Sequence, residues 1–181
     1  MLPAIFVVAS AGIVRLSWGS LRSPRSHGFY RFFAFEFIAA LVLLNVPYWF
    51  HDPLCPRQLA SWLLLGASAG IAIEAFRLLR IVGQPSREFS DPTRLGFENT
   101  SKLVIVGLYR YIRHPMYASL LVLAWGACLK DLSVASLALV LAASLSLAAT
   151  ALAEERENLA RFGASYADYM KTTRRFIPFL F

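Results

Sequence analysis

Five apolar stretches limit this chain to folds that place helices in a membrane. They cover roughly residues 2–18, 29–50, 58–80, 115–129 and 132–153. A helix rises about 1.5 Å per residue, so about 20 residues cross a hydrocarbon core of about 30 Å. The fourth stretch alone would reach only about 22 Å, so it must gain length from the residues before it or lie tilted in a thinned region. We predict an all-α integral membrane helical bundle with about five transmembrane helices.

The composition agrees with a membrane protein. Hydrophobic residues make up 57% of the 181 residues and charged residues 16%, whereas soluble domains carry about 25% charged residues. A net charge of +7 would suit a nucleic-acid-binding protein, but the cations gather in particular loops and leave no basic folded surface. We therefore expect no nucleic-acid partner.

The distribution of Lys and Arg predicts the orientation. Sixteen of the 18 fall in or beside the first loop, the loop between the third and fourth stretches, and the C-terminal region. Only Arg57 and Lys130 fall on the opposite side. Cytoplasmic loops carry the excess of positive charge, so we predict an outside N-terminus and a cytoplasmic C-terminus. The first stretch has no cation before Arg15, which favours a retained span over a cleaved signal peptide.

We predict one bundle in two parts. Residues 1–82 form a three-helix transmembrane part, and residues 83–181 form the part that we expect to carry the chemistry. The second part has a cytoplasmic loop, a hairpin of the fourth and fifth stretches joined by the tight turn LKDLS, and a C-terminal cytoplasmic helix and tail. The polar residues 83–101 are too many for a simple connection, which predicts a functional loop.

Both cysteines, and two glycines spaced four apart, fall in or near the apolar stretches. Cys55 and Cys128 are too few and too far apart for a zinc or iron–sulfur site, so no metal is expected. Both are expected near the outer face, where a disulfide is conceivable, although isolated membrane cysteines are more often small apolar residues. Gly66 and Gly70, four positions apart, predict a close approach of two helices.

The stretch RYIRHPMYAS opens the fourth apolar segment with an unusual group of polar residues. Proline suits the first position of a helix, so Pro115 predicts a helix start with Arg113 and His114 at the level of the lipid headgroups. Tyr109 and Tyr117 flank these residues. A helix N-terminus backed by Arg and His also suits an anionic group such as a carboxylate.

An acidic pair lies at the end of the fifth segment. Glu154 and Glu155 follow the apolar run directly, where the helix dipole and the positive-inside rule both disfavour acids. We expect the helix to continue past them, with Glu157 and Arg161 forming a surface ion pair. Neither Glu154 nor Glu155 has such a local partner, and their carboxylates suit a ribose diol or an ammonium group. The hairpin would bring them beside the start of the fourth segment.

These residues resemble a family. GLYRYIRHPMYAS, then EERENLARFGASYADYM and the ending RFIPF, are similar to the isoprenylcysteine carboxyl methyltransferase and phospholipid methyltransferase superfamily, over about residues 103–178. The resemblance implies an integral membrane enzyme that binds S-adenosylmethionine in a cytoplasmic pocket formed by its last two spans. Ser119 stands where the family commonly has Gly, which puts the shape of the pocket in doubt.

The resemblance also implies roles for individual residues. We predict catalytic roles for Arg113 and Glu155, and contacts with the cofactor from Tyr109, His114, Pro115, Tyr117, Glu154 and Glu155. Because a sulfonium methyl group is already activated, the enzyme must mainly orient a nucleophile and exclude water. The acceptor is predicted to be a lipid-like or prenylated molecule that enters from the bilayer.

Three further residues are candidates for binding that acceptor. Glu36 and Glu74 lie inside predicted spans, where acids are functional candidates. The alternative for Glu74 is an ion pair with Arg77 on its own helix, and the alternative for Glu36 is a pair with Arg15 across the bundle. Arg174 belongs to a tail that is predicted to be amphipathic and to lie on the membrane, and the resemblance implies that this end of the chain lies near the active site.

Several functions fit this pattern. Carboxyl O-methylation of an isoprenylcysteine-type substrate is our first prediction, and N-methylation of a phospholipid amine headgroup is the second. Membrane sterol and enone reductases that use NADPH have a related motif resembling R-H-P-N-Y, but Met116 replaces its Asn here, and the Glu154-Glu155 pair favours the methyltransferase. A non-enzymatic scaffold or transporter predicts polar residues at the bilayer midplane, whereas here they gather at the cytoplasmic boundary.

Overall fold

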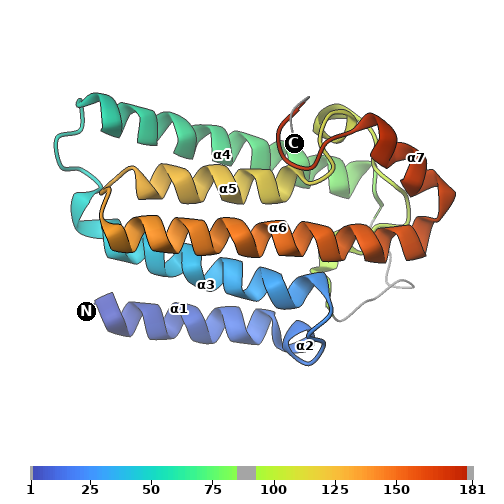
Figure 1. Cartoon of the computed structure of the whole chain (residues 1–181), viewed down its shortest axis with the longest axis horizontal. Helices are drawn as coiled ribbons and strands as arrows, with labels where there is room; N and C mark the ends of the chain where they lie inside the picture. Colours follow the sequence, from blue (N-terminus) through green and yellow to red (C-terminus); the bar gives the residue numbers. More distant parts are fainter. Residues whose placement is uncertain (1, 85–92, 179–181) are drawn as a thin grey trace.

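The chain folds as an all-α bundle, which confirms the predicted fold class (Figure 1). The computed structural model describes residues 2–84 and 93–178. Part of the predicted functional loop, residues 85–92, lies outside the described residues. The helices, with η marking short 3-10 turns, are α1 (Leu2–Leu16), α2 (Trp18–Leu21), α3 (His27–Asn45), η1 (Val46–Tyr48), α4 (Pro56–Ile81), η3 (Gly96–Glu98), η4 (Gly107–Arg110), α5 (Pro115–Cys128), α6 (Val134–Phe162) and α7 (Ala164–Thr172).

Three helices of the described chain are long and apolar enough to cross a membrane, judged by length and composition: His27–Tyr48, α4 and α6. The other two predicted spans form shorter apolar helices, because α1 has 15 residues and α5 has 14. The fourth span is therefore short, as its sequence indicates. Helix α6 continues past Glu155 to Phe162, as predicted, and carries the acidic pair beyond the apolar run.

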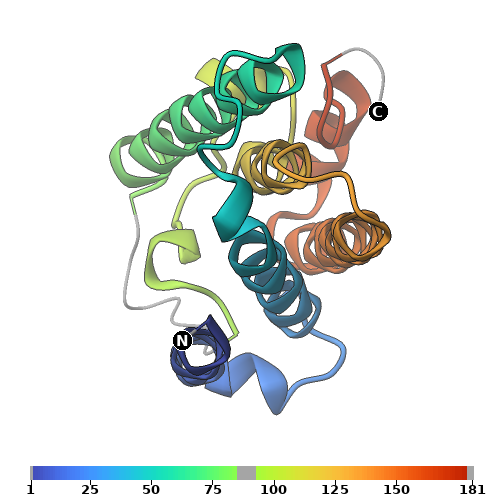
Figure 2. The same cartoon turned by 90° about the vertical axis from the view of Figure 1, so that its left-hand side faces the viewer.

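Helix α5 lies at the centre of the bundle. It packs against α3, α4 and α6, whereas α1 packs along the outer side of α3 (Figures 1 and 2). Small side chains fill the centre, since Ala34, Ala124, Ala143 and Ala151 are all fully buried. Interfaces between helices in a membrane favour such small residues because they let the backbones approach closely.

The predicted glycine contact on α4 is wrong. A Cβ added at Gly66 or Gly70 would meet nothing within 4 Å, so neither glycine allows a helix to approach. The close approach between α4 and α5 instead uses Gly126, where an added Cβ would lie 3.2 Å from Leu64 and Leu65. The four-residue spacing of the glycines therefore pointed to the correct helix, α4, but not to the face of α4 that packs against α5.

A buried lysine joins the helices at the end of the bundle where the N-terminus lies. Lys130 is fully buried; its Nζ donates to Gln58 Oε1 at 2.9 Å and lies 3.5 Å from the centre of the Trp62 ring. Asn45 donates to the Ala127 carbonyl at 2.8 Å, so the turn between α5 and α6 is held from α3 as well. Both cysteines are free thiols, so the conceivable disulfide is not formed.

The opposite end of the bundle depends on a close backbone contact at Gly28. A Cβ at this position would lie 2.2 Å from Ser20 Oγ and 2.5 Å from the Thr93 carbonyl oxygen. Ser20 donates to that same carbonyl at 3.0 Å. The start of α3, helix α2 and the segment that begins at Thr93 therefore meet at a point where only glycine fits.

We predict that Gly28→Ala lowers the free energy of unfolding by about 1–3 kcal/mol, because overpacking forces neighbouring groups apart. Thermal unfolding in detergent measures the effect. Gly12→Ala is the matched control on α1, where an added Cβ meets nothing within 4 Å; it should leave stability unchanged or raise it, because alanine favours helices over glycine by up to about 1 kcal/mol. Equal effects of the two substitutions would contradict the packing argument.

Candidate active site

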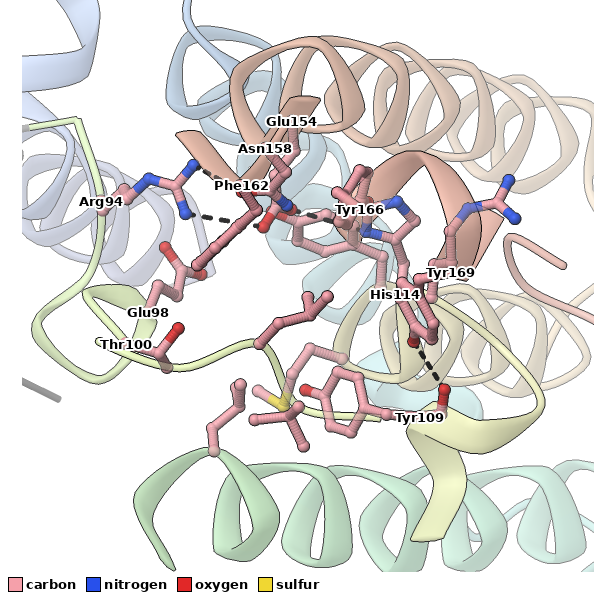
Figure 3. A pocket seen from close by; sticks show the side chains of 16 residues that line it. Arg94, Glu98, Thr100, Tyr109, His114, Glu154, Asn158, Phe162, Tyr166 and Tyr169 are labelled. Carbon is pink, nitrogen blue, oxygen red and sulfur yellow. Dashed lines mark hydrogen bonds and ion pairs between the residues drawn. The ribbon is translucent and has the colours of Figure 1, made fainter. Parts of the chain in front are cut away.

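A cavity of about 630 Å³, including open space at its mouth, lies at the end of the bundle where α5 begins (Figure 3). Its walls come from the end of α4, the segment from 94 to 109, the start of α5, the end of α6, and α7. The lining residues are Leu79, Arg94, Glu98, Thr100, Leu103, Val104, Tyr109, Arg113, His114, Met116, Tyr117, Glu154, Asn158, Phe162, Tyr166 and Tyr169.

The C-terminal tail fixes the chain just before α5. Arg113 N donates to the Arg174 carbonyl at 2.7 Å, and His114 N donates to the Arg175 carbonyl at 3.1 Å. Pro115 then occupies the first turn of α5, where its missing N–H costs nothing. The ring of His114 stacks on that of Tyr117, with centres 5.4 Å apart.

His114 lies between the two members of the acidic pair. Its Nδ1 is 3.5 Å from Glu154 Oε2, and its Nε2 is 3.5 Å from Glu155 Oε1. Burial lowers the pKa of His114, but the hydrogen bonds and charges of Glu154 and Glu155 outweigh it, so the pKa is raised above its ordinary value of 6.5. The two carboxylates therefore favour the protonated form of the ring.

Glu155 lies outside the cavity lining and holds the surrounding segments together. Its side chain is 5% exposed; it accepts from Arg113 Nε at 2.8 Å and from Arg175 Nη2 at 3.0 Å. Arg113 Nη1 also donates to the carbonyls of Thr173 at 2.5 Å and Met170 at 3.3 Å. One carboxylate thus joins α6, the start of α5 and the tail after α7.

Glu154 faces the cavity instead. Neighbouring residues of an α-helix point about 100° apart, so the two acids of the pair enter different surroundings. Glu154 approaches His114 and also Arg94, whose Nη1 lies 4.0 Å away. The structure therefore gives the two glutamates different partners, a distinction that the adjacent letters in the sequence do not show.

The structure adds cavity residues that the sequence analysis did not predict. Asn158 and Phe162 follow Glu154 at intervals of four on α6, so helical spacing could have identified them. Tyr166 and Tyr169 lie in the stretch EERENLARFGASYADYM, which carries part of the family resemblance. The Tyr169 hydroxyl donates to the Tyr109 carbonyl at 2.6 Å. Arg94 and Glu98 belong to the loop that was predicted to be functional, but nothing in the sequence distinguished these two residues, because their segment reaches the cavity only through tertiary contacts.

The expected pair of Glu157 with Arg161 is replaced by contacts to other segments. Glu157 Oε2 lies 2.6 Å from His27 Nδ1 on α3 and accepts from Arg94 Nη2 at 3.3 Å. Arg94 Nη2 also donates to Asn158 Oδ1 at 3.0 Å. Arg161 donates to the Thr100 carbonyl. Helix α6 is thereby attached to both the first helices and the segment after residue 93.

The three candidates for acceptor binding lie outside the cavity lining. Glu36 accepts from Ser10 Oγ at 2.7 Å, between α1 and α3. Glu74 lies 3.7 Å from Arg77 on the surface of α4, as the alternative interpretation expects. Arg174 is exposed, and its backbone rather than its side chain contacts the segment before α5. The neighbouring Arg175, which the prediction did not include, is the residue that reaches Glu155.

Ser119 also lies outside the cavity lining, in the contact between α4 and α5. Its Oγ donates to the Met116 carbonyl at 2.6 Å, and its own carbonyl accepts from Ser68 Oγ at 2.8 Å. The hydroxyl is satisfied within its own helix, so the serine is accommodated without narrowing the cavity. Within the described residues, no group of three His, Cys, Asp or Glu side chains could hold a metal ion.

Comparison with known proteins gives one family. The family model described as phospholipid methyltransferase matches residues 57–165, which is more than half of the chain. No curated protein and no solved structure matches. The matched segment runs from the first turn of α4 to the start of α7 and includes His114, Glu154 and most of the cavity lining.

We predict that Glu155→Gln lowers the free energy of unfolding by about 3–5 kcal/mol, because it leaves the buried guanidinium of Arg113 without its carboxylate. Unfolding by a denaturing detergent measures this change. Glu74→Gln is the matched control, since its pair with Arg77 is largely exposed, and it should cost less than about 1 kcal/mol. A loss at Glu155 as small as that at Glu74 would contradict the structural role of the cluster.

We also predict that the imidazole of His114 titrates at a pH above 6.5. NMR of histidine-labelled protein in detergent measures the midpoint, and His114→Gln assigns the signal. Because the pKa is raised on folding, this group's contribution to stability is complete below about pH 6.5 and is lost as the pH rises through the folded pKa. A midpoint below 6.5 would show that burial outweighs the two glutamates.

Proposed function

The chain belongs to the phospholipid methyltransferase family, and we propose that it is an S-adenosylmethionine-dependent membrane methyltransferase acting on a lipid-like acceptor. One observation carries this proposal: His114 and Glu154 meet in a cavity at one end of the apolar helices. Such an end is where a water-soluble donor and a membrane-borne acceptor would meet. The cation distribution supports a cytoplasmic location of this end, with the N-terminus outside.

The residues around the cavity fit the cofactor. Glu154 on the cavity wall suits an ammonium group or a ribose diol, and the ring of His114, which faces it, holds this carboxylate in place. Burial raises the pKa of Tyr109 and Tyr166, so these rings stay neutral and offer apolar faces to an adenine. No described residue makes a hydrogen bond with the buried Tyr117 Oη, which leaves a polar atom for a ligand.

The protein's task in this reaction is to hold and orient its ligands. When bound, the cofactor supplies a methyl group that its sulfonium has already activated. Glu154, held in place by His114, would bind polar groups of the ligand, while Phe162 and the tyrosines exclude water, which sharpens orientation and strengthens electrostatic contacts. We propose that Arg113 and Glu155 are positioning residues, because their contacts fix His114 and the C-terminal tail.

For the acceptor, we propose an amine headgroup on a lipid. The cavity's cations already face carboxylates: Arg94 faces Glu157, Arg113 faces Glu155, and His114 faces both members of the acidic pair. An incoming carboxylate would also meet Glu98. The matched family points in the same direction. Carboxyl O-methylation of an isoprenylcysteine-type substrate remains the alternative prediction.

Calorimetric binding of S-adenosylhomocysteine to detergent-purified protein tests the proposal. We expect micromolar affinity, weakened at least tenfold, or about 1.4 kcal/mol, by His114→Ala and by Glu154→Gln. Glu74→Gln, on the surface of α4, should bind as the unsubstituted protein does. If the folded protein binds NADPH instead, the reductase hypothesis would replace the methyltransferase proposal. Binding of neither ligand would favour a non-enzymatic role.

A labelled-methyl assay then distinguishes the acceptors. Phosphatidylethanolamine vesicles and a farnesylcysteine analogue are offered in parallel to reconstituted protein. Label in the phospholipid supports the amine proposal, and base-labile label in the farnesylcysteine analogue restores the carboxyl prediction.

A further inference from the structure

A third carboxylate lies on the cavity wall, away from the motifs that identify the family. Glu98 in η3 lines the cavity on the side of Arg94 and Thr100, across from His114 and Tyr109 (Figure 3). The cavity therefore has two polar ends. One is formed by motif residues at the start of α5, and the other by the segment that follows residue 93.

Two residues of α3 hold this carboxylate in place. Arg31 Nη1 donates to Glu98 Oε1 at 2.7 Å and to Oε2 at 2.5 Å. His27 Nε2 lies 3.7 Å from Oε2, and Leu95 N donates to the same oxygen at 2.9 Å. Neither Arg31 nor His27 is part of the cavity lining. A ligand in the cavity thus meets the negative member of this cluster and not its cations.

The surroundings keep Glu98 ionised. Burial raises the pKa of this carboxyl and the charge of Glu154 adds to that effect, but Arg31 and His27 outweigh both, so its pKa is lowered. A carboxylate that keeps its charge inside a cavity attracts a cation and repels an anion, and it does so more strongly than in water because the local dielectric is low.

The support for Glu98 comes from a part of the chain that precedes the matched segment. Arg31 Nη2 donates to the Thr93 carbonyl at 3.2 Å, and Ser20 donates to the same oxygen at 3.0 Å. The family match begins at residue 57, so α2 and α3, which precede it, support the segment that carries Glu98 without lining the cavity themselves. The close contact at Gly28 holds α2 and the segment that begins at Thr93 against α3.

We propose that Glu98 selects the acceptor by binding the positively charged amine of a lipid headgroup, and that Arg31 and His27 are positioning residues for it. This inference rests on the proposed function, because it assigns the second polar end of the same cavity. Leu79, Leu103, Val104 and Met116 line the cavity as well and provide an apolar surface for the acyl chains.

Binding of two short-chain phospholipids tests the assignment. Dihexanoyl phosphatidylethanolamine and dihexanoyl phosphatidylglycerol have the same acyl chains, and only the first carries an amine. In the presence of saturating S-adenosylhomocysteine, we expect the unsubstituted protein to bind the amine lipid at least tenfold more tightly. Glu98→Gln should reduce this preference to less than threefold, whereas the surface substitution Glu74→Gln should preserve it.

A double substitution tests the positioning role. Arg31→Lys keeps the charge but loses the two-oxygen contact, so it should reduce the lipid preference about threefold to tenfold. If Arg31 acts through Glu98, the same substitution should have no further effect in Glu98→Gln protein. A merely structural role of Arg31 would instead weaken both lipids and S-adenosylhomocysteine in either background.

The outcomes separate this inference from the proposed function. Normal S-adenosylhomocysteine binding with an unchanged lipid preference in Glu98→Gln would overturn the role of Glu98 and leave the methyltransferase intact. Loss of S-adenosylhomocysteine binding in Glu98→Gln, without a change in lipid preference, would assign Glu98 to the cofactor and also overturn it. Failure of the unsubstituted protein to bind S-adenosylhomocysteine would instead remove the proposed function.

Discussion

The ion cluster around Glu155 is the interaction on which the rest of the site depends. A single carboxylate on α6 binds guanidinium groups from the start of α5 and from the C-terminal tail. Removing two arginines and a glutamate from water is costly, and the structure offsets that cost with further bonds from Arg113 to the carbonyls of Thr173 and Met170. The result is a fixed backbone at His114, which the cavity requires.

The fold could be predicted from sequence because a bilayer leaves few choices. Long apolar runs must be helices there, since each buried backbone group needs a partner within its own segment. The sequence also indicated that α5 is short and that α6 extends beyond its acids. It did not show which helix faces meet. Gly66 and Gly70 have the spacing of a helix contact but face outward. Lipid and protein both offer apolar surroundings to a helix, so the sequence carries little information on which face packs against protein.

The site was predictable only where motifs are local. His114, Tyr117 and Glu154 lie in recognisable stretches, and the structure brings them together. Arg94 and Glu98 were not identified, because charged residues in a polar loop resemble solvated surface until the partner segment is known. The partners of Glu98 lie on α3, more than sixty positions earlier in the chain. Contacts between residues so far apart in the chain produce no periodic pattern in the sequence.

The shortness of α5 affects how deep in the bundle the cavity lies. Its 14 residues rise only about 21 Å. At the end of the bundle where α5 begins, α4 and α6 therefore extend further than α5 does (Figure 1). The side of the cavity formed by the start of α5 is therefore set back from the ends of α4 and α6. Each methylene withdrawn from the bilayer would cost about 0.8 kcal/mol. For the proposed lipid acceptor, a site set back into the bundle shortens the length of acyl chain that must leave the membrane.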